Sequence, residues 1–246
     1  REEILRQAAM ARAFGVEVEE ITPAEVHAKY PHVETEGMTG AVYLPKDGQG
    51  DPANIALALA KGARARGAIV AERVKATGVV RAGRRITAVD WAGEDGSAGQ
   101  IEAEHVINCA GMWGRDVGRM LGSNVPLQAC EHFYIVTEAI PSLRELPVLR
   151  VPDEYAYYKE DAGKILLGAF EPVAKPWALQ GIPESFEFDQ LPEDFDHFEP
   201  ILEMAVKRLP LLADAGIHTF FNGPESFTPD DAYHLGQAPE MDNVWV

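Results

Sequence analysis

VINCAGMW (Val106–Trp113) begins as an apolar run, passes through Ala110 and Gly111, and continues into a segment with helical spacing. The residues up to Ala110 predict a strand that is buried on both faces, as in a parallel sheet. Gly111 lets the backbone turn sharply and approach a flat ligand, because glycine has no Cβ. A helix over residues 113–121 should follow, with Gly122 as its C-terminal stop. Open α/β sheets bind nucleotides through such a strand, turn and helix, but an ordinary strand-to-helix turn has the same pattern.

The composition limits the class of protein and its partners. The chain has 246 residues, enough for one large domain or two small ones, and its 46% hydrophobic and 25% charged residues are typical of soluble globular proteins. Its 39 acidic and 22 basic residues give a net charge of −17, which argues against nucleic acid and anionic membranes as partners. No apolar run is long enough to span a membrane, and no signal peptide is visible. We therefore expect a cytoplasmic protein, or a mitochondrial matrix protein if the source is eukaryotic.

Both ends of the chain have the character of internal cuts. The chain starts at Arg1, directly in the helix-like run Glu2–Phe14, and it stops in the apolar stretch Asn243–Val246. We expect an internal piece of a longer protein.

Local motifs for a self-contained active site are absent from the sequence. Gly48 and Gly50 begin a G-x-G-x-x-G pattern, but Ala53 stands where the third glycine belongs, so no phosphate-binding loop is predicted. The P-loop, HExxH and G-x-S-x-G motifs are also missing, and no metal site is expected because the histidines and cysteines lack metal-ligand spacing. Cys109 and Cys130 are both expected to be buried, reduced thiols.

The first half of the chain predicts helices followed by β-structure. Thr22-Pro23-Ala24-Glu25 is a capping box, which predicts a short helix to Lys29, and Asp51 should cap a helix that stops at Gly67. Four β-like runs follow, Ala68–Glu72, Val74–Val80, Arg84–Trp91 and Ile101–Ala110.

The second half predicts an antiparallel sheet and one helix. The expected strands of the sheet are Leu127–Glu138, Val148–Val151, Tyr155–Lys159 and Lys164–Phe170, and the chain returns later through Ile217–Phe221. A helix over 193–207 should bury one face, made of Phe195, Phe198, Ile201, Leu202, Ala205 and Val206. Since no internal repeat is present, two interleaved domains are the simplest architecture.

Four motifs stand in the order in which FAD-dependent amine oxidoreductases carry them. They are Asn108–Trp113, Glu131–Thr137, Tyr157-Tyr158 and Asn222–Asp230. Together with Asp47–Gly67 and Glu72–Val74, they give a resemblance to the D-amino-acid-oxidase-like superfamily that covers nearly the whole chain. Within this superfamily the chain most resembles the dimethylglycine and sarcosine dehydrogenases.

The resemblance implies a mixed α/β (α+β) fold. The central part of a Rossmann-like FAD-binding domain would be interleaved with an antiparallel-sheet substrate domain. Residues 1–40 would form substrate-domain or linker helices, 41–126 part of the FAD-binding domain, 127–215 the substrate domain, and 216–246 a truncated return to the FAD-binding domain. In the family, the glycine-rich pyrophosphate loop precedes the region present here.

The resemblance assigns four residues to FAD. Val74 matches a position whose backbone meets the adenine end of the cofactor, and Ala110 and Gly111 match the turn packed against it. Trp113 lies beside that turn. Ordinary core positions would account for Val74 and Trp113 equally well.

The resemblance also assigns residues to the substrate. His132 and Tyr157 match catalytic residues that face the flavin in dimethylglycine-oxidising relatives, although each alone also fits an ordinary strand position. Loss of a hydride from an N-methyl carbon needs a free nitrogen lone pair, and an imidazole titrates in the useful range. The Tyr157 phenol can hydrogen-bond His132 or a substrate carboxylate. Tyr158 is the alternative, because adjacent strand residues face opposite sides, and Arg150 is a candidate to bind the carboxylate.

We therefore expect the full-length protein to oxidise N-methyl amino acids such as dimethylglycine or sarcosine with FAD, and the isolated piece to be inactive. Another amino acid, an amine or glycerol 3-phosphate is the alternative substrate, and a non-catalytic interaction module without flavin is the alternative class. A tetrahydrofolate-binding domain downstream would narrow the substrate. One departure from the family is Asp231, which stands where the family has glycine after the Thr228-Pro229-Asp230 turn.

Overall fold

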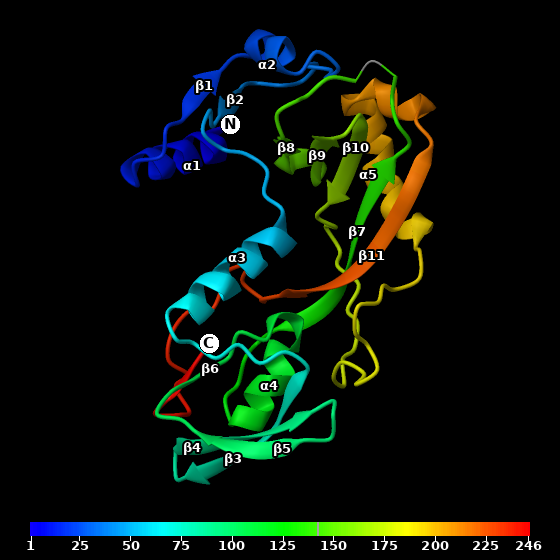
Figure 1. The fold of residues 1–246 in the computed structure, drawn as a ribbon. Coiled ribbons are helices and arrows are strands. Elements are labelled where there is room, and N and C mark those ends of the chain that lie inside the picture. The colour runs from blue at the N-terminus through cyan, green and yellow to red at the C-terminus, as the bar shows by residue number, and fades with distance from the viewer. Residues whose placement is uncertain (142) are drawn as a thin grey trace. The chain divides into compact units, whose positions relative to one another are not determined.

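The structure is a computed structural model that describes residues 1–141 and 143–246. The chain divides into two compact units (Figure 1). Unit 1 comprises Arg1–Gly50, His132–Val173 and Gln190–Gly223, and unit 2 comprises Asp51–Glu131, Ala174–Asp189 and Pro224–Val246. The units are interleaved, as the sequence predicts. The expected boundaries at 40, 126 and 215 fall short of the observed divisions at 50, 131 and 223.

Two segments join a different unit from the one expected. Residues 41–50 lie in unit 1, because strand β2 (Ala41–Tyr43) pairs with strand β1 (Glu19–Ile21). Residues 174–189 lie in unit 2, where the Trp177 amide donates to the Ala129 carbonyl at 2.8 Å and the Ile182 amide donates to the Asp116 carboxylate at 3.1 Å. Whether unit 1 serves the substrate and unit 2 serves the cofactor stays a prediction.

Unit 1 is built on an antiparallel sheet with the strand order β11-β7-β10-β9-β8. The strands are β7 (Gln128–Thr137), β8 (Leu149–Val151), β9 (Ala156–Asp161), β10 (Lys164–Ala169) and β11 (Ile217–Phe227). The ends of β7 and β11 extend into unit 2. The antiparallel sheet predicted for the second half is therefore confirmed for β7 to β10, within a few residues at each strand end, and β11 joins this sheet although the sequence places 216–246 in the other domain.

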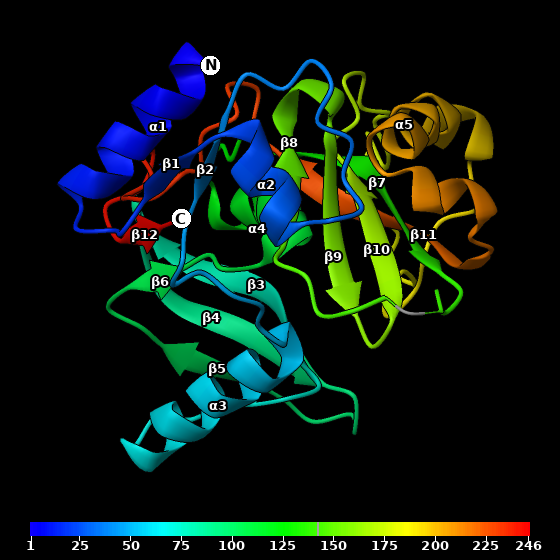
Figure 2. The same ribbon diagram turned by 90° about the horizontal axis from the view of Figure 1, so that it is seen from above.

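One face of this sheet forms the core of unit 1. Helices α2 (Pro23–Lys29) and α5 (Phe195–Arg208) supply side chains to the same core, and α5 lies beside β10 (Figures 1 and 2). Thr22 and Glu25 form the predicted capping box at the start of α2. The core face of α5 contains Phe198, Ile201 and Ala205. Phe195 is 45% exposed, so its predicted burial is wrong. It lies in the first turn of α5, and its ring contacts the ring of Phe220 in a tilted arrangement.

The remaining elements of unit 1 are short. Helix α1 (Glu2–Ala13) precedes the β1–β2 pair, and the 3-10 turns η2 (Pro152–Glu154) and η3 (Pro210–Asp214) follow β8 and α5. The Arg208 guanidinium is paired with Glu154, and its Nε lies 3.0 Å from the Glu154 Oε1 atom. This ion pair joins the end of α5 to η2.

Unit 2 has a smaller core. Its antiparallel sheet consists of β3 (Val74–Ala82), β4 (Arg85–Gly93) and β5 (Ala98–Glu102), and a parallel pair joins β6 (Val106–Ile107) to β12 (Val244–Trp245). The buried side chains are Ile86, Leu121, Ala238, Met241 and Val244. Asn243 connects these parts, since its fully buried side chain accepts from the Ile86 amide and donates to the carbonyls of Ile86 and Glu104.

Helix α3 (Pro52–Ala65) begins at the predicted Asp51 cap and ends before Gly67. None of its residues is buried, and Ile55, Leu57 and Leu59 are all more than half exposed. The β-like run 68–72 forms no strand, because the chain there is a loop held by Arg64, which donates to the Val70 carbonyl and the Glu72 carboxylate.

The opening motif differs from expectation in its burial. Only Val106 and Ile107 are in the strand, which pairs with β12 in the described chain. Ile107 is 66% exposed, so the predicted burial of both faces is wrong. Cys109 is exposed, which corrects its predicted burial, whereas Cys130 is buried as expected. Among the described residues, no helix is long and apolar enough to cross a membrane.

Candidate functional site

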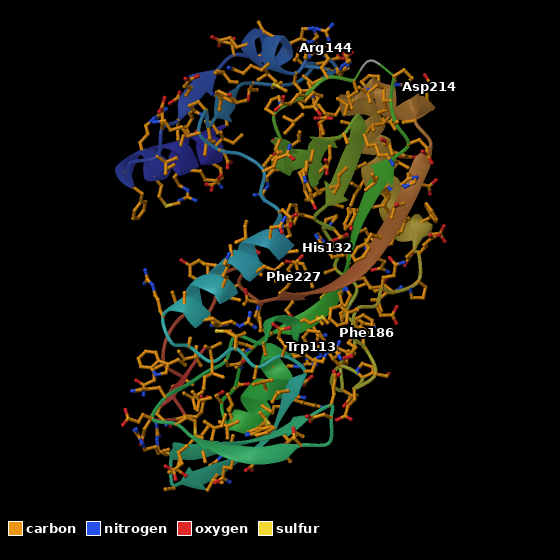
Figure 3. All side chains as sticks on the ribbon, in the orientation of Figure 1. Trp113, His132, Arg144, Phe186, Asp214 and Phe227 are labelled. Atoms are coloured by element: carbon orange, nitrogen blue, oxygen red, sulfur yellow. The ribbon has the colours of Figure 1, made fainter. Side chains whose placement is uncertain are left out.

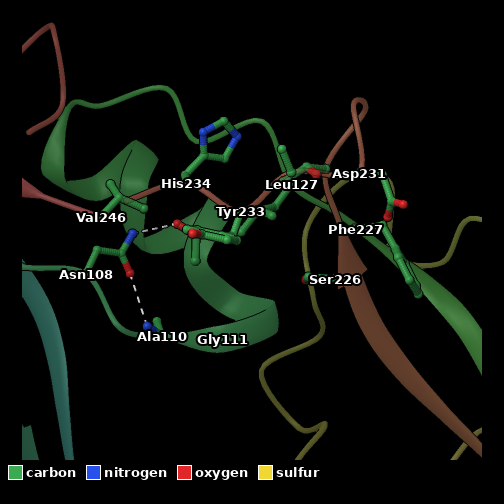
Figure 4. A pocket seen from close by; sticks show the side chains of 13 residues that line it. Asn108, Ala110, Gly111, Leu127, Ser226, Phe227, Asp231, Tyr233, His234 and Val246 are labelled. Carbon is green, nitrogen blue, oxygen red and sulfur yellow. Dashed lines mark hydrogen bonds between the residues drawn. The ribbon is translucent and has the colours of Figure 1, made fainter. Parts of the chain in front are cut away.

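The glycine turn after β6 is held in place by one buried side chain. Asn108 donates from Nδ2 to the Gly114 carbonyl at 2.8 Å, and its Oδ1 accepts from the Ala110 amide at 3.2 Å (Figure 4). Gly111 has φ +55°, a left-handed conformation that favours glycine, and starts the 3-10 turn η1 (Gly111–Trp113). Helix α4 (Gly114–Leu121) follows and ends at Gly122 with φ +76°. The predicted glycine turn, helix and helix stop are present, and the strand before them is shorter than predicted.

A pocket of about 350 Å³ opens beside this turn. Its lining comes entirely from unit 2 and includes the predicted Ala110 and Gly111 (Figure 4). A Cβ added to Gly111 would meet no atom within 4 Å, so the space in front of the turn is open. The other lining residues are Asn108, Gly114, Leu127, Ser226, Phe227, Thr228, Asp231, Ala232, Tyr233, His234 and Val246.

The departure at Asp231 is accommodated by the backbone. Asp231 has φ +58°, a left-handed conformation that favours glycine. Aspartate is among the few residues with a side chain that tolerate this region. The turn is closed by the Asp231 amide, which donates to the Thr228 carbonyl, and by the Ala232 amide, which donates to Asp230. The pocket wall thus keeps a glycine-like turn and gains a carboxylate.

Val74 and Trp113 do not line this pocket. Val74 starts β3, pairs with Gly93 and is 40% exposed. Trp113 ends η1 and is 39% exposed; it is labelled in Figure 3. Their assignment to FAD stays a prediction.

In unit 1, the sheet register brings three predicted residues to one face. Arg150 pairs with Tyr157, Tyr157 pairs with Gly168, and Gly168 pairs with Tyr134, so these residues form one row across β8, β9, β10 and β7. His132 lies two residues from Tyr134 on β7 and therefore on the same face, and the ring of Phe170, which directly follows β10, contacts the His132 ring. Tyr134 is the last residue of this row, and the ring of Phe221 stacks on it with the ring centroids 4.7 Å apart.

The ring of Phe170 contacts all three predicted residues. Its centroid lies 5.7 Å from that of His132 and 5.6 Å from that of Tyr157, and the Arg150 guanidinium carbon lies 4.8 Å from it. Phe170 is 40% exposed, and Arg150 is exposed. An imidazole, a phenol and a guanidinium therefore surround one aromatic ring, and we call these four residues the Phe170 cluster.

His132 is held by a buried carboxylate. Glu171, whose side chain is 3% exposed, accepts at Oε2 from His132 Nδ1 at 3.0 Å and at Oε1 from the Phe133 amide at 2.9 Å. The His132 side chain itself is 14% exposed, and it projects from β7 in Figure 3. One carboxylate thus fixes both the imidazole and the backbone beside it.

Tyr157 lies flat across its neighbouring strand because residue 168 is glycine. A Cβ built on Gly168 would come within 1.9 Å of the Tyr157 Cζ atom and 2.2 Å of its hydroxyl oxygen. Backbone at that position cannot carry a side chain without moving the ring. Gly168 is therefore part of what positions the phenol.

Tyr158 lies on the opposite face of β9. It is fully buried in the core of unit 1, and burial raises the pKa of its phenol, with a further contribution from Glu154. The structure therefore does not bring Tyr158 to the Phe170 cluster. Its assignment as a substrate contact is untested, but its placement is that of a core residue.

A profile of the family described as FAD dependent oxidoreductase (DAO) matches residues 1–246. The chain belongs to this family. It is 36% identical over 244 residues to the mitochondrial sarcosine dehydrogenase of Mus musculus, a match that covers 97% of this chain and 26% of that protein. It is 32% identical over 235 residues to the mitochondrial dimethylglycine dehydrogenase of the same organism, covering 92% of this chain and 26% of that protein.

A third relative is named as a regulatory subunit and not as a dehydrogenase of an amino acid. The chain is 34% identical over 236 residues to the mitochondrial pyruvate dehydrogenase phosphatase regulatory subunit of Mus musculus, covering 94% of this chain and 26% of that protein. The chain thus spans about a quarter of the length of each of these three relatives.

Two solved structures confirm the fold. L-proline dehydrogenase from P. horikoshii has a TM-score of 0.78 at 22% identity, covering 95% of this chain and 59% of that one. Glycine oxidase from Geobacillus kaustophilus has a TM-score of 0.71 at 23% identity, covering 100% of this chain and 60% of that one. The predicted mixed α/β fold and the predicted family are both confirmed.

The pocket of this FAD dependent oxidoreductase chain suits part of the cofactor. Small residues and a glycine turn open onto it, Leu127 and Phe227 supply apolar surface, and Ser226 and Thr228 carry hydroxyls. Its lining contains a carboxylate, Asp231, and no lysine or arginine. This donor set fits an uncharged ring system better than a diphosphate, which binds to helix N-termini and cations. The fit agrees with the absence of a glycine-rich loop from the sequence.

Sequence reasoning missed three residues at these sites. Asn108 was visible inside the opening motif, and its position just before the turn could have suggested a role in holding it. Phe170 ends a predicted strand and Glu171 follows it, but nothing local shows that they will contact His132. Only the pairing of strands far apart in the sequence reveals them.

Proposed function

We propose that the full-length protein is an FAD-dependent oxidoreductase that oxidises N-methyl amino acids of the dimethylglycine or sarcosine type. The observation that carries this proposal is the Phe170 cluster, which gathers an imidazole, a phenol and a guanidinium on one sheet face. The relatives named as sarcosine and dimethylglycine dehydrogenases support the substrate class.

The groups of the cluster match the groups of such a substrate. An N-methyl amino acid carries a carboxylate and an amine, which is an ammonium ion at neutral pH. The Arg150 guanidinium is suited to the carboxylate, since planar guanidinium groups bind carboxylates with two parallel hydrogen bonds. Arg150 also keeps its charge beside the Phe170 ring, where a cation is attracted to the aromatic face.

His132 is suited to the amine. Oxidation at an N-methyl carbon requires the nitrogen lone pair, so the ammonium must first lose its proton. A neutral imidazole can take that proton at the operating pH. Tyr157, which can both donate and accept, is suited to orient the carboxylate or the imidazole. FAD, when bound, would accept the hydride.

The experiment uses the purified full-length protein. Its absorption spectrum should show a flavin, and anaerobic addition of sarcosine or dimethylglycine should bleach that flavin. Proline, glycine and glycerol 3-phosphate serve as the comparison substrates. If no flavin is present, the oxidoreductase proposal is wrong; if the flavin is bleached by a comparison substrate only, the substrate class alone is wrong.

A second candidate is a non-catalytic regulatory protein that keeps the fold. The relative named as a regulatory subunit of pyruvate dehydrogenase phosphatase favours it. The two candidates differ in the same experiment, because a regulatory protein would show no bleaching with any of the amines. A regulatory role would also leave the His132 side chain without a chemical task, so His132→Ala would not alter any activity.

Two further features of the whole protein are proposals. Mitochondrial relatives support a matrix location if the source is eukaryotic. Tetrahydrofolate is a candidate acceptor of the one-carbon unit that N-demethylation releases, and a folate-binding domain elsewhere in the full-length protein would be needed for it. Formaldehyde release during turnover, measured with and without tetrahydrofolate, tests this: folate should suppress the release.

A further inference from the structure

We propose that Glu171 is a positioning residue that fixes the proton of His132 on Nδ1 and so makes Nε2 the nitrogen that exchanges a proton with the substrate amine. This inference rests on the proposed function for the identity of the amine. The state of the imidazole itself can be measured independently of that function.

The geometry leaves the carboxylate little freedom. The Glu171 side chain is 3% exposed, and each of its oxygens has its own donor, His132 Nδ1 at 3.0 Å and the Phe133 amide at 2.9 Å. A backbone amide can only donate, so it holds Oε1 in place and thereby aims Oε2 at the ring. Since Phe133 directly follows His132 on β7, the carboxylate is tied to the strand that carries the imidazole.

The contact determines the tautomer. An ionised carboxylate oxygen can only accept, so Nδ1 must carry a hydrogen whether the ring is neutral or protonated. In the neutral ring the lone pair then lies on Nε2. A carboxylate in the same place relative to a histidine has this orienting effect in catalytic triads and in metal sites.

Other charged and titratable groups also lie near His132. Within unit 1, Tyr157 on β9 and Arg150 on β8 contact the same Phe170 ring that contacts the imidazole. Beside it on β7, Glu131 is paired with Lys175 at 3.0 Å. Glu171 is hydrogen-bonded directly to the imidazole, so a carboxylate oxygen lies against the ring.

The proposed step is a proton transfer that conserves charge. The N–H bond of the substrate ammonium breaks, an N–H bond forms at His132 Nε2, and the ring becomes an imidazolium next to the Glu171 carboxylate. The amine is left neutral with its lone pair free. The Glu171 carboxylate keeps its hydrogen bonds to the ring and to the Phe133 amide during this step.

The test replaces Glu171 by glutamine in the full-length protein. An amide has one accepting oxygen, so it cannot satisfy both the Phe133 amide and an Nδ1–H, and its NH₂ group favours the tautomer protonated on Nε2. Glu171→Asp keeps the carboxylate and serves as the conservative rescue. Glu154→Gln is the matched control, since it removes another carboxylate of unit 1 that is paired with Arg208 rather than with a histidine.

The first measurement is the ¹⁵N spectrum of the histidine-labelled protein, with the His132 signals assigned by their loss in His132→Gln. The wild type and Glu154→Gln should show a protonated Nδ1 and a non-protonated Nε2 in the neutral ring, and Glu171→Gln should lose this pattern. A wild-type signal with the proton on Nε2 would overturn the proposal, and this outcome does not depend on whether the Glu171 variants fold.

The second measurement is anaerobic flavin reduction by sarcosine or dimethylglycine across a range of pH. Glu171→Gln should lower the limiting rate constant by at least about tenfold and change its pH dependence, whereas Glu171→Asp should recover part of the rate. An unchanged pH profile in Glu171→Gln, equal to that of Glu154→Gln, would refute the positioning role. If the wild type is not reduced by any amine, the proposed function fails, and the ¹⁵N spectrum still decides the state of His132.

Discussion

The two faces of the sheet in unit 1 are made from the same strands, but one face is a buried core and the other is partly exposed and polar. One face carries Phe133, Ile135, Tyr158, Ile165 and Leu167, each no more than 2% exposed, and it packs with α2 and α5. The other face carries the Phe170 cluster, in which the Phe170 ring is 40% exposed. Stability is concentrated on the first face and candidate chemistry on the second, although the residues alternate along the chain.

This separation follows from strand geometry. Side chains of a strand point alternately to opposite faces, so a polar residue can sit one position from a core residue without entering the core. His132 and Phe133 are such neighbours on β7, and Tyr157 and Tyr158 are such neighbours on β9. A substitution on one face should therefore change stability with little effect on chemistry, and a substitution on the other face should do the reverse.

The largest effect is expected on the core face. Phe133→Ala removes a fully buried ring that contacts the rings of His197, Phe198 and Phe220. We expect a loss of about 3–5 kcal/mol in the free energy of unfolding, because both the buried area and a cavity contribute. Chemical denaturation of the full-length protein measures it. A loss below about 1 kcal/mol would mean that this face is not the core that the burial indicates.

The neighbouring substitution His132→Ala should act on rate. We expect flavin reduction by the amine to slow by at least about 100-fold, the range of general acid–base catalysis, with a much smaller effect on the denaturation midpoint than Phe133→Ala. Rapid-mixing spectroscopy under anaerobic conditions measures the rate. An unchanged rate would remove His132 from the chemistry and would leave the second face without its central group.

Gly168→Ala tests whether backbone shape holds the cluster. The new methyl group would lie within 1.9 Å of the Tyr157 Cζ atom, so the phenol must move. We expect the rate of flavin reduction to fall by about tenfold, since small displacements of a positioned group are costly. The free energy of unfolding should fall by the amount typical of overpacking, about 1–3 kcal/mol. Tyr157→Phe with Gly168→Ala should add little to Gly168→Ala alone, and full additivity in this double mutant would argue against the contact.

The sequence predicted the faces better than it predicted the cluster. Period-two alternation and the turn at Ala162-Gly163 place β9 and β10 correctly, and adjacent Tyr157 and Tyr158 do lie on opposite faces. The Glu171–His132 contact joins residues 39 apart in the sequence, and local patterns do not determine which distant segments meet. The exposure of Ile107 and Cys109 was also not predicted, because an apolar run does not show which other segments will cover its side chains.

The smallest effect, and the one that most directly compares the faces, is expected from Tyr158→Phe. Within the described part of the chain, the Tyr158 hydroxyl is buried with no hydrogen-bond partner, so its removal relieves an unsatisfied polar group. We expect a gain of about 1 kcal/mol in unfolding free energy at neutral pH and no change in the rate of flavin reduction. Tyr157→Phe should give the opposite result, a slower reaction at unchanged stability.

The pH dependence of Tyr158→Phe has a definite sign. Burial raises the pKa of the Tyr158 phenol above its ordinary value, so the unfolded chain releases this proton at a lower pH than the folded chain. The contribution to stability is present below the unfolded pKa of about 10 and is lost as pH rises above it. Replacing the phenol should therefore make the loss of stability above that pH shallower, which denaturation at a series of alkaline pH values measures. If Tyr158→Phe instead raised the half-saturating concentration of the amine at unchanged stability, Tyr158 would contact the substrate, and the division of work between the two faces would be wrong.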